Sequence, residues 1–186
     1  FTNIAPHSTI INLYNEAGII SSDDQKIWQL DEDQVVTIRG QAEDSIDDIE
    51  TLRHIWWPDD QQSSLIYDLT GRTTEFEMSW QTAGLPTIRL DVTDNDGSTS
   101  NVNERWVNIR NVPPTVQPLD SILPVAEGQT ITLIGNSTDT QSDIPSLRKC
   151  WDVDPGLDSD GVGGASDDCD IIGDELVYAW NRSGSH

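Results

Sequence analysis

The sequence predicts an all-β fold of tandem two-sheet sandwiches, and three observations lead to this prediction. First, Glu32–Trp56 and Glu127–Trp151 lie 95 positions apart and share ten identical residues out of 25. Second, short apolar runs rich in β-branched residues are separated by Gly, Pro, Asn, Asp and Ser, the pattern of strands and turns. Third, no amphipathic helical stretch stands out. Recurrence at a fixed period indicates repeated modules rather than one enzyme core.

The repeat also predicts domain boundaries. The match resumes 100 positions apart, where Glu75–Trp80 corresponds to Glu175–Trp180. Phe1–Pro6 resembles Ile109–Pro114, the end of the first full copy. The two prolines within Asn111–Val116 predict a short, stiff linker there. We therefore expect three parts: residues 1–5 as the tail of a preceding repeat, residues 6–112 as a complete sandwich, and residues 113–186 as a second sandwich that lacks its last strands.

Within the first copy, each apolar segment between turn residues predicts a strand. The segments with β-branched residues or tryptophans give strands over 35–41, 52–57, 75–80, 87–93 and 102–110. Residues 9–13 suggest an added edge strand, and residues 65–67 a short one. Asp94–Gly97 predicts a tight turn, because Asn and Asp tolerate left-handed conformations and Gly adopts them freely. About seven short strands in about 100 residues are typical of a two-sheet sandwich.

The chain is strongly acidic, with 33 Asp and Glu against 10 Lys and Arg, a net charge of −23 and a pI near 4.1. Such a charge repels phosphate backbones and anionic lipids, which argues against nucleic acid as a partner and against binding to membrane surfaces. No apolar run approaches the roughly 18 residues of a membrane span, so we also expect no direct membrane insertion. The acidity suits high salt or bound divalent cations, although a solvated surface explains most of the carboxylates.

Two cysteines, Cys150 and Cys169, flank the one segment in which the second copy is longer than the first. The first copy has Ile55 at the position of Cys150. This pattern predicts a disulfide that closes the loop 150–170 and hence an oxidising compartment. The alternative is two unrelated buried thiols. Zinc is disfavoured, because two cysteines without a nearby histidine do not complete its usual ligand set.

Several motifs recur in a fixed order. Each copy has Glu-x-Gln-x-x-Thr-(Ile/Leu)-x-Gly, an acidic loop and a tryptophan-bearing strand, and the first continues with Val92-Thr-Asp-Asn-Asp-Gly97 and Val112-Pro-Pro-Thr-Val116. Together they resemble polycystic-kidney-disease (PKD) type repeats. This resemblance implies immunoglobulin-like β-sandwiches, the second one incomplete, in a large microbial cell-surface or secreted protein. The extreme acidity resembles that of large surface proteins from marine or salt-adapted prokaryotes, archaea included. One departure is clear: Trp56-Trp-Pro-Asp59 and Trp151-Asp-Val-Asp154 stand where the family has Trp-Asp-Phe-Gly-Asp-Gly.

The acidic segment 151–170 is the strongest candidate for a metal site. It holds seven aspartates and no Lys or Arg in 20 residues. Calcium takes six to eight oxygen ligands from flexible loops of this kind, and the segment resembles the Asp-rich loops of thrombospondin type 3 repeats. The alternative is a solvated acidic loop without metal. The candidate calcium ligands are Asp152, Asp154, Asp158, Asp160, Asp167, Asp168 and Asp170.

A second set of aspartates lies in the loops that follow the strand 35–41 and its counterpart, and in the predicted turn. These side chains either cap turns by accepting bonds from backbone amides or share a calcium ion with a neighbouring linker. Capping is the simpler interpretation. The set comprises Asp44, Asp48, Asp94, Asp96, Asp139 and Asp143.

The tryptophans divide into core and surface candidates. Trp56 and Trp151 occupy equivalent mid-strand positions, so each is expected in the core between the sheets. Trp57 is adjacent and must face the other way, where it could stack on a sugar ring or pack under a loop. Asn136 and Asn181 begin Asn-X-Ser/Thr sequons and are possible glycosylation sites.

These observations favour a non-enzymatic module, because none of the three histidines has a nearby Ser or Cys in a nucleophile-like turn and no glycine-rich phosphate-binding loop follows a strand. We expect an extracellular or cell-surface structural or adhesive role, spacing or assembling a large protein and stabilised by calcium. Its partners would be neighbouring repeats, surface glycans or proteins, or another copy whose tail Phe1–Ile4 adds a strand to the incomplete sandwich. The simpler alternative to strand addition is that the missing strands are truncated or disordered. The alternative is a carbohydrate-binding accessory module of a secreted hydrolase.

Overall fold

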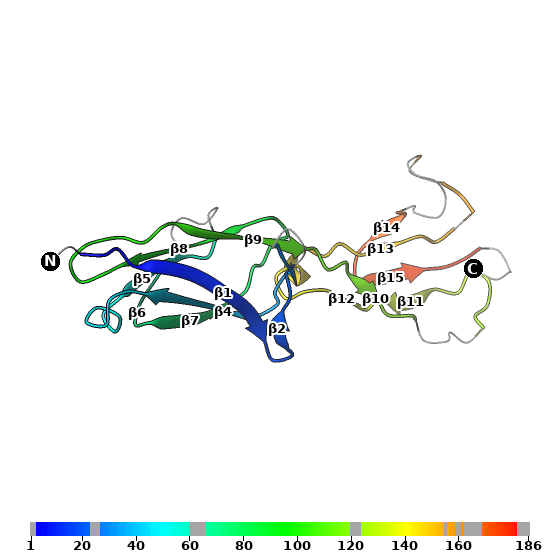
Figure 1. Cartoon of the computed structure of the whole chain (residues 1–186). Helices are drawn as coiled ribbons and strands as arrows, with labels where there is room; N and C mark the ends of the chain where they lie inside the picture. The colour runs from blue at the N-terminus through cyan, green and yellow to red at the C-terminus, as the bar shows by residue number, and fades with distance from the viewer. Residues whose placement is uncertain are drawn as a thin grey trace. The chain divides into compact units, whose positions relative to one another are not determined.

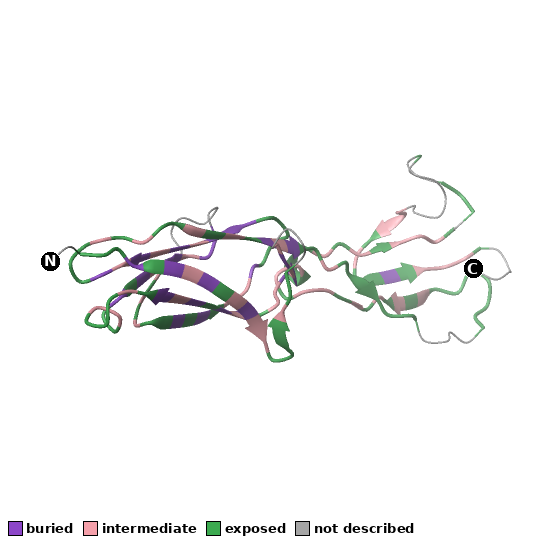
Figure 2. Cartoon of the chain, in the orientation of Figure 1, coloured by how far each residue is buried: buried purple, intermediate pink, exposed green. Residues whose placement is uncertain are grey.

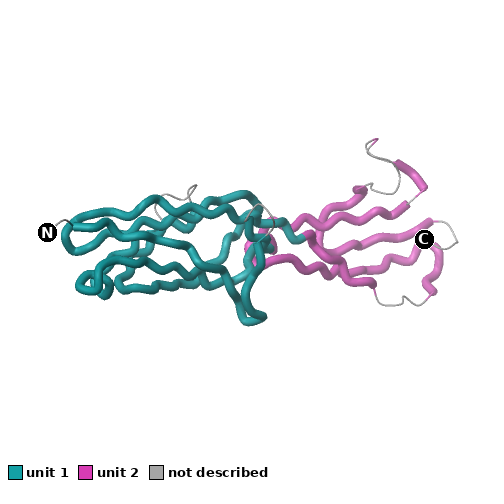
Figure 3. The backbone as a smooth tube through the Cα atoms, in the orientation of Figure 1, with its two compact units in different colours: residues 1–112 teal, residues 113–186 magenta. Residues whose placement is uncertain are grey.

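The computed structural model describes residues 3–22, 27–59, 66–119, 124–154, 156–158, 161 and 169–181. The chain separates into two compact units, residues 1–112 and residues 113–186 (Figure 3). Nearly all regular structure in the described residues is β-strand, so the predicted fold class is confirmed. Each unit is considered by itself below.

The first unit is a sandwich of two sheets (Figure 1). Pairing is antiparallel except between β3 and β9, which run parallel. One sheet has the order β2-β1-β4-β7, and it contains β1 (His7–Asn15), β2 (Gly18–Ile20), β4 (Val36–Glu43) and β7 (Thr73–Met78). The other has the order β3-β9-β8-β5-β6, and it contains β3 (Trp28–Asp31), β5 (Arg53–Trp57), β6 (Tyr67–Thr70), β8 (Thr87–Thr93) and β9 (Asn103–Arg110).

This strand order is that of an immunoglobulin-like sandwich. Strands β1, β4 and β7 take the places of strands A, B and E, and β9, β8, β5 and β6 those of G, F, C and C′. The inward positions of each strand alternate with outward ones, as the burial colours show (Figure 2). Trp56 is fully buried and lies in the core, as the sequence predicted. The other fully buried side chains around it include Leu13, Ile38, Leu52, Ile88, Leu90 and Val92.

Trp56 packs against a position that has no side chain. A Cβ added to Gly40, in the middle of β4, would lie 2.5 Å from the Cη2 and Cζ2 atoms of the Trp56 ring. The indole N–H donates to Thr74 Oγ1 at 3.0 Å, and Thr74 pairs with Gly40 in the sheet. One side chain on β5 therefore contacts both β4 and β7 of the opposite sheet.

The second unit contains short two-stranded sheets: β10–β12, β11–β15 and β13–β14. Its one described buried hydrophobic residue is Leu176, whereas Val116 is 78% exposed. The regular elements are β10 (Thr115–Val116), β11 (Ile131–Ile134), β12 (Ser137–Thr138), the 3-10 turn η1 (Ile144–Ser146), β13 (Cys150–Trp151), β14 (Ile171–Ile172) and β15 (Glu175–Tyr178).

Equivalent residues of the two units make the same local contacts. The amides of Asp33 and Gly128 donate to the carbonyls of Trp80 and Trp180, at 2.8 and 2.9 Å. Both Asp33 and Gly128 have positive φ, at 60° and 75°. The close approach of tryptophan to glycine also recurs, because a Cβ on Gly135 would lie 3.1 Å from Trp151 Cζ2. These contacts span the segments in which the sequence repeat was found.

The entry segment of the first unit differs from expectation. Residues 9–13 were expected at an edge, and the part of this segment before Leu13 pairs with β4 alone; β1 runs longer, however, and its last residues, Leu13–Asn15, also pair with β2. The hairpin β1–β2 turns at Glu16 and Ala17, and Gly18, the first residue of β2, has a φ of 124° that favours a residue without a Cβ. Strand β3 was not anticipated, because its parallel partner β9 lies about 80 residues further along the chain.

Substituting Gly40 tests the contact with Trp56. Gly40→Ala should lower the free energy of unfolding of the first unit by about 1–3 kcal/mol, the usual range for overpacking a core. Gly84→Ala is the matched control, because a Cβ there meets nothing within 4 Å, and it should change stability by no more than about 0.5 kcal/mol. Urea unfolding followed by tryptophan fluorescence measures both. Equal effects of the two substitutions would contradict the packing described.

Candidate functional site

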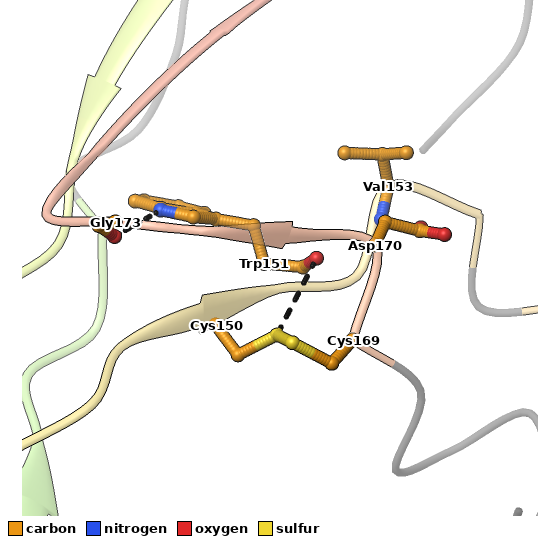
Figure 4. The surroundings of a disulfide bond; sticks show 6 residues. All are labelled: Cys150, Trp151, Val153, Cys169, Asp170 and Gly173. Carbon is orange, nitrogen blue, oxygen red and sulfur yellow. Dashed lines mark hydrogen bonds between the residues drawn. A yellow bond between two sulfur atoms is a disulfide. The ribbon is translucent and has the colours of Figure 1, made fainter. Parts of the chain in front are cut away.

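The acidic loop is closed by a disulfide between Cys150 and Cys169, as predicted (Figure 4). Beside it, the indole N–H of Trp151 donates to the carbonyl of Gly173 at 2.9 Å. The Asp170 carboxylate accepts a bond from the Val153 amide at 2.8 Å. The two ends of the loop are therefore held by one covalent and several polar contacts.

The described aspartates of this loop accept hydrogen bonds from its backbone. Asp152 Oδ1 accepts from the Asp154 amide at 3.0 Å, and Asp158 Oδ1 accepts from the Gly161 amide at 2.6 Å. The predicted ligands Asp160, Asp167 and Asp168 lie outside the described residues. In the part of the chain that is described, no group of three or more His, Cys, Asp or Glu side chains is arranged to hold a metal ion.

The second set of aspartates caps turns. Asp44 Oδ1 accepts from the Ser45 amide at 2.7 Å, and the equivalent Asp139 Oδ1 accepts from the Thr140 amide at 2.9 Å. Asp48 accepts from the Ser45 hydroxyl at 2.7 Å. Two members of the set differ: Asp143 directly precedes η1 without a side-chain cap bond, and Asp96 is exposed in its turn.

Asp94 is the most enclosed of these carboxylates. Its Oδ1 accepts from the amides of Asp96 and Ser98, at 3.0 and 2.8 Å, and its Oδ2 accepts from the Asn3 side chain at 2.9 Å. Burial by itself would raise the pKa of Asp94, but these hydrogen bonds outweigh it, so the pKa lies below its ordinary value. The carboxylate therefore fixes the turn and also holds Asn3, at the start of the described chain, against it.

Trp57 is half-buried on the outer face of the five-stranded sheet. The Arg89 guanidinium lies 5.0 Å from the centre of its ring and is paired with Asp91 at 2.7 Å. A cation over the ring occupies a surface that a sugar would need. Trp106 on β9 is 49% exposed, and sequence reasoning did not single it out. It faces outward from the same sheet, so alternation from the buried Val107 would have found it.

An apolar groove of about 340 Å³ lies within the second unit. Its walls come from β10 with the residues that follow, from the segment around β12, and from β13 with the residues that precede it. The apolar side chains that line it are Pro114, Val116, Pro118, Leu119, Leu147 and Trp151. The sequon residue Asn136 also lines the groove, whereas Asn181 is exposed near the end of the described chain.

His54 is the one histidine that the described residues place in the core. It is fully buried on β5, two residues before Trp56, and neither ring nitrogen has a hydrogen-bond partner. Burial is the main cause that lowers the pKa of His54 below the ordinary value of 6.5. The backbone of Leu52 has the opposite, smaller effect on this pKa, although it forms no hydrogen bond of normal geometry with the ring. A fully buried imidazole whose nitrogens have no hydrogen-bond partner packs as part of the core.

No family model and no curated protein matches the chain. Among solved structures it is similar to the PKD domain of an M14-like peptidase from a Thermoplasmatales archaeon, with 10% identity, a TM-score of 0.39, and coverage of 56% of this chain and 92% of that one. It is also similar to fibronectin(III)-like modules of Clostridium thermocellum CbhA, with 11% identity, a TM-score of 0.37, and coverage of 66% of this chain and 63% of that one. A third similar structure contains the titin domains Z1Z2 in complex with telethonin, with 18% identity, a TM-score of 0.38, and coverage of 81% of this chain and 70% of that one. The fold assignment itself rests on the sheet order of the first unit.

Two further findings concern the surroundings of the protein. Among the described residues no helix is both long and apolar enough to cross a bilayer. The disulfide, in contrast, is typical of extracellular and other oxidising compartments.

The buried His54 predicts a loss of stability in mild acid. Because its pKa is lower in the folded state, the unfolded state binds the proton more tightly between the two pKa values. The stability that depends on a neutral His54 is therefore fully present above about pH 6.5. It declines as the pH falls below that value, by at most about 1.4 kcal/mol per pH unit. Urea unfolding of the native chain and of His54→Leu between pH 8 and pH 5 measures this. A decline of the same size in the variant would contradict the assignment.

Proposed function

We propose that the chain is a non-enzymatic structural module of an extracellular or cell-surface protein, in which immunoglobulin-like units space or assemble other parts. The observation that carries this proposal is the recurrence of one scaffold in both units: the tryptophan on a glycine, the positive-φ turn and the aspartate cap. Reuse of a scaffold is what a spacer needs, whereas catalysis needs a site specific to one unit.

The arrangement of titratable groups supports a structural role. The aspartates that stand out in sequence bond to backbone amides of their own turns, and the buried His54 has no reactive partner. Strongly perturbed groups that converge in a cleft are the usual mark of an active site. The described residues offer polar groups that stabilise loops instead.

Calcium is proposed as the stabilising ion of the loop 150–170. The support is the concentration of negative charge in a covalently closed loop: seven aspartates repel one another unless a cation or solvent screens them. Binding of calcium to the folded chain alone would raise its melting temperature by mass action. The case for calcium is weaker at the turn aspartates, because their oxygens already accept hydrogen bonds from backbone amides.

The calcium proposal predicts a higher melting temperature in millimolar calcium than in EDTA. The gain should disappear in a variant carrying Asp152→Asn, Asp154→Asn and Asp158→Asn. The matched control carries Glu16→Gln, Glu50→Gln and Glu77→Gln, which remove the same number of negative charges from the first unit. Calorimetry of all three proteins separates a loop site from general screening. Equal melting temperatures with calcium and with EDTA in the native chain would refute calcium stabilisation.

The second candidate function is carbohydrate binding, which the two outward tryptophans of the five-stranded sheet favour. Because Arg89 covers Trp57, we expect Trp106 to make the larger contribution to any stacking on sugars. On a glycan array, Trp106→Ala should then abolish binding and Trp57→Ala should weaken it. Absence of binding by the native chain would remove this candidate.

A further inference from the structure

A pocket lies within the first unit, at the side where the edge strands β2 and β3 of its two sheets are found. Its volume is about 500 Å³, which is within the range of small-molecule sites. Residues of β1 and β2 line it from one sheet, and residues of β3 and β9 line it from the other. We call it the edge pocket. Its apolar lining residues are Ile10, Ile11, Ile19, Ile20 and Trp28.

A bulge in β1 interrupts the strand edge at this pocket. The register between β1 and β4 shifts at Ile11, and β2 pairs with β1 only from Leu13 onward. Before the bulge, the side chain of Asn103 takes the place of a neighbouring strand: it accepts from the Ile10 amide and donates to the Ser8 carbonyl, both at 3.3 Å. Too little of the β1 edge is left between these two stretches for a peptide strand to pair, so the pocket suits a small molecule.

Arg105 supplies the positive charge of the edge pocket. It lies on β9 between Asn103, which bonds to β1 of the other sheet, and the buried Val107, so alternation along the strand turns it toward the same side. Its guanidinium donates to the Glu104 carbonyl at 2.7 Å, which uses one of its five N–H groups. The remaining donors form a fork that matches a carboxylate.

Within the described residues, no carboxylate forms an ion pair with Arg105. The basic residues that do have such a partner there are Arg53, Arg72, Arg89, Arg110 and Lys149. Arg39 and Arg148 also lack one, but both are exposed, whereas Arg105 is half-buried in an apolar pocket. Less solvent screens a carboxylate bound at a half-buried guanidinium, so the attraction there is stronger than at an exposed one.

The remaining lining residues and the charge of the chain define the rest of the ligand. Ile11 and Ile19 are 39% and 73% exposed, so an apolar group that covers them removes hydrophobic surface from water. The net charge of −23 repels anions in general, and one guanidinium balances one negative charge. A singly charged ligand with an apolar body is therefore favoured over a phosphate or a dicarboxylate.

We propose that the edge pocket binds a small organic monocarboxylate, with its carboxylate on Arg105 and its apolar body against Ile11, Ile19 and Trp28. Charge-assisted hydrogen bonds to the guanidinium fix the orientation of the ligand, and the apolar contacts select for its body. This inference goes beyond the proposed structural role and does not depend on it.

Octanoate serves as the probe, and octanamide is its uncharged control of nearly the same shape. In NMR spectra of the native chain, octanoate should displace the resonances of the Arg105 guanidinium and the Trp28 indole saturably. Octanamide should bind about tenfold more weakly or worse, because it lacks the charge-assisted bonds. Equal binding of the two compounds, or no displacement by millimolar octanoate, would overturn the proposal.

Two matched arginine variants locate the binding. Arg105→Gln should weaken octanoate binding by about tenfold or more. Arg39→Gln removes the same charge from an exposed position outside the pocket and should leave binding unchanged. Ile19→Ser removes apolar contact from a residue too exposed to matter for folding, and it should also weaken binding. Equal effects of the two arginine substitutions, or native affinity in Ile19→Ser, would contradict the proposal.

The competing occupants are carboxylates of the chain itself. Asp23 and Asp24 follow Ser22, which lines the pocket, and both lie outside the described residues. A variant with Asp23→Asn and Asp24→Asn is compared with the native chain in the absence of octanoate. An unchanged Arg105 guanidinium resonance supports the proposal. A displaced resonance shows that the guanidinium is already paired within the chain, and the proposal is then wrong.

Discussion

The fold depends on a tryptophan that lies against a glycine across the two sheets. In the first unit the Trp56 ring occupies the space that any side chain at Gly40 would fill, and its N–H reaches Thr74. A buried indole must find a hydrogen-bond acceptor as well as an apolar surface, so this contact fixes the separation and the register of both sheets. In the second unit Trp151 lies against Gly135 and donates to Gly173.

The two units differ in what surrounds this common centre. Around Trp56 the strands β8 and β9 complete the core, so its neighbours are fully buried. Around Trp151 the described chain forms pairs of strands and an apolar groove. The disulfide ties the strand of Trp151 to the segment leading into β14, which limits how far the open side can relax.

Much of this arrangement could be predicted from the sequence, because it depends on local patterns. The alternation in residues 87–93 located β8, the position of both cysteines in the one segment that is longer in the second copy located the disulfide, and the repeat located the buried Trp56. Features that depend on register across strands were not predictable. The cover of Trp57 by Arg89 and the parallel pairing of β3 with β9 both join residues far apart in sequence.

The proposed calcium site shows the same difference between what local sequence patterns predict and what depends on contacts in the folded chain. Composition identified an acidic loop, but the orientation of each carboxylate follows from which backbone amide lies nearby. Asp160, Asp167 and Asp168 lie outside the described residues, so calcium binding by the loop is still a prediction. The turn aspartates show how readily such side chains find partners in their own backbone.

The central claim is that both units are built around the same tryptophan–glycine contact. The NMR chemical shifts of the glycine Hα protons test it most directly, because an aromatic ring displaces the resonances of protons that lie against it. We predict ring-current displacement at both Gly40 and Gly135, with Gly84 near its random-coil value. A random-coil shift at Gly135 beside a displaced one at Gly40 would contradict the claim that the second unit shares the scaffold of the first.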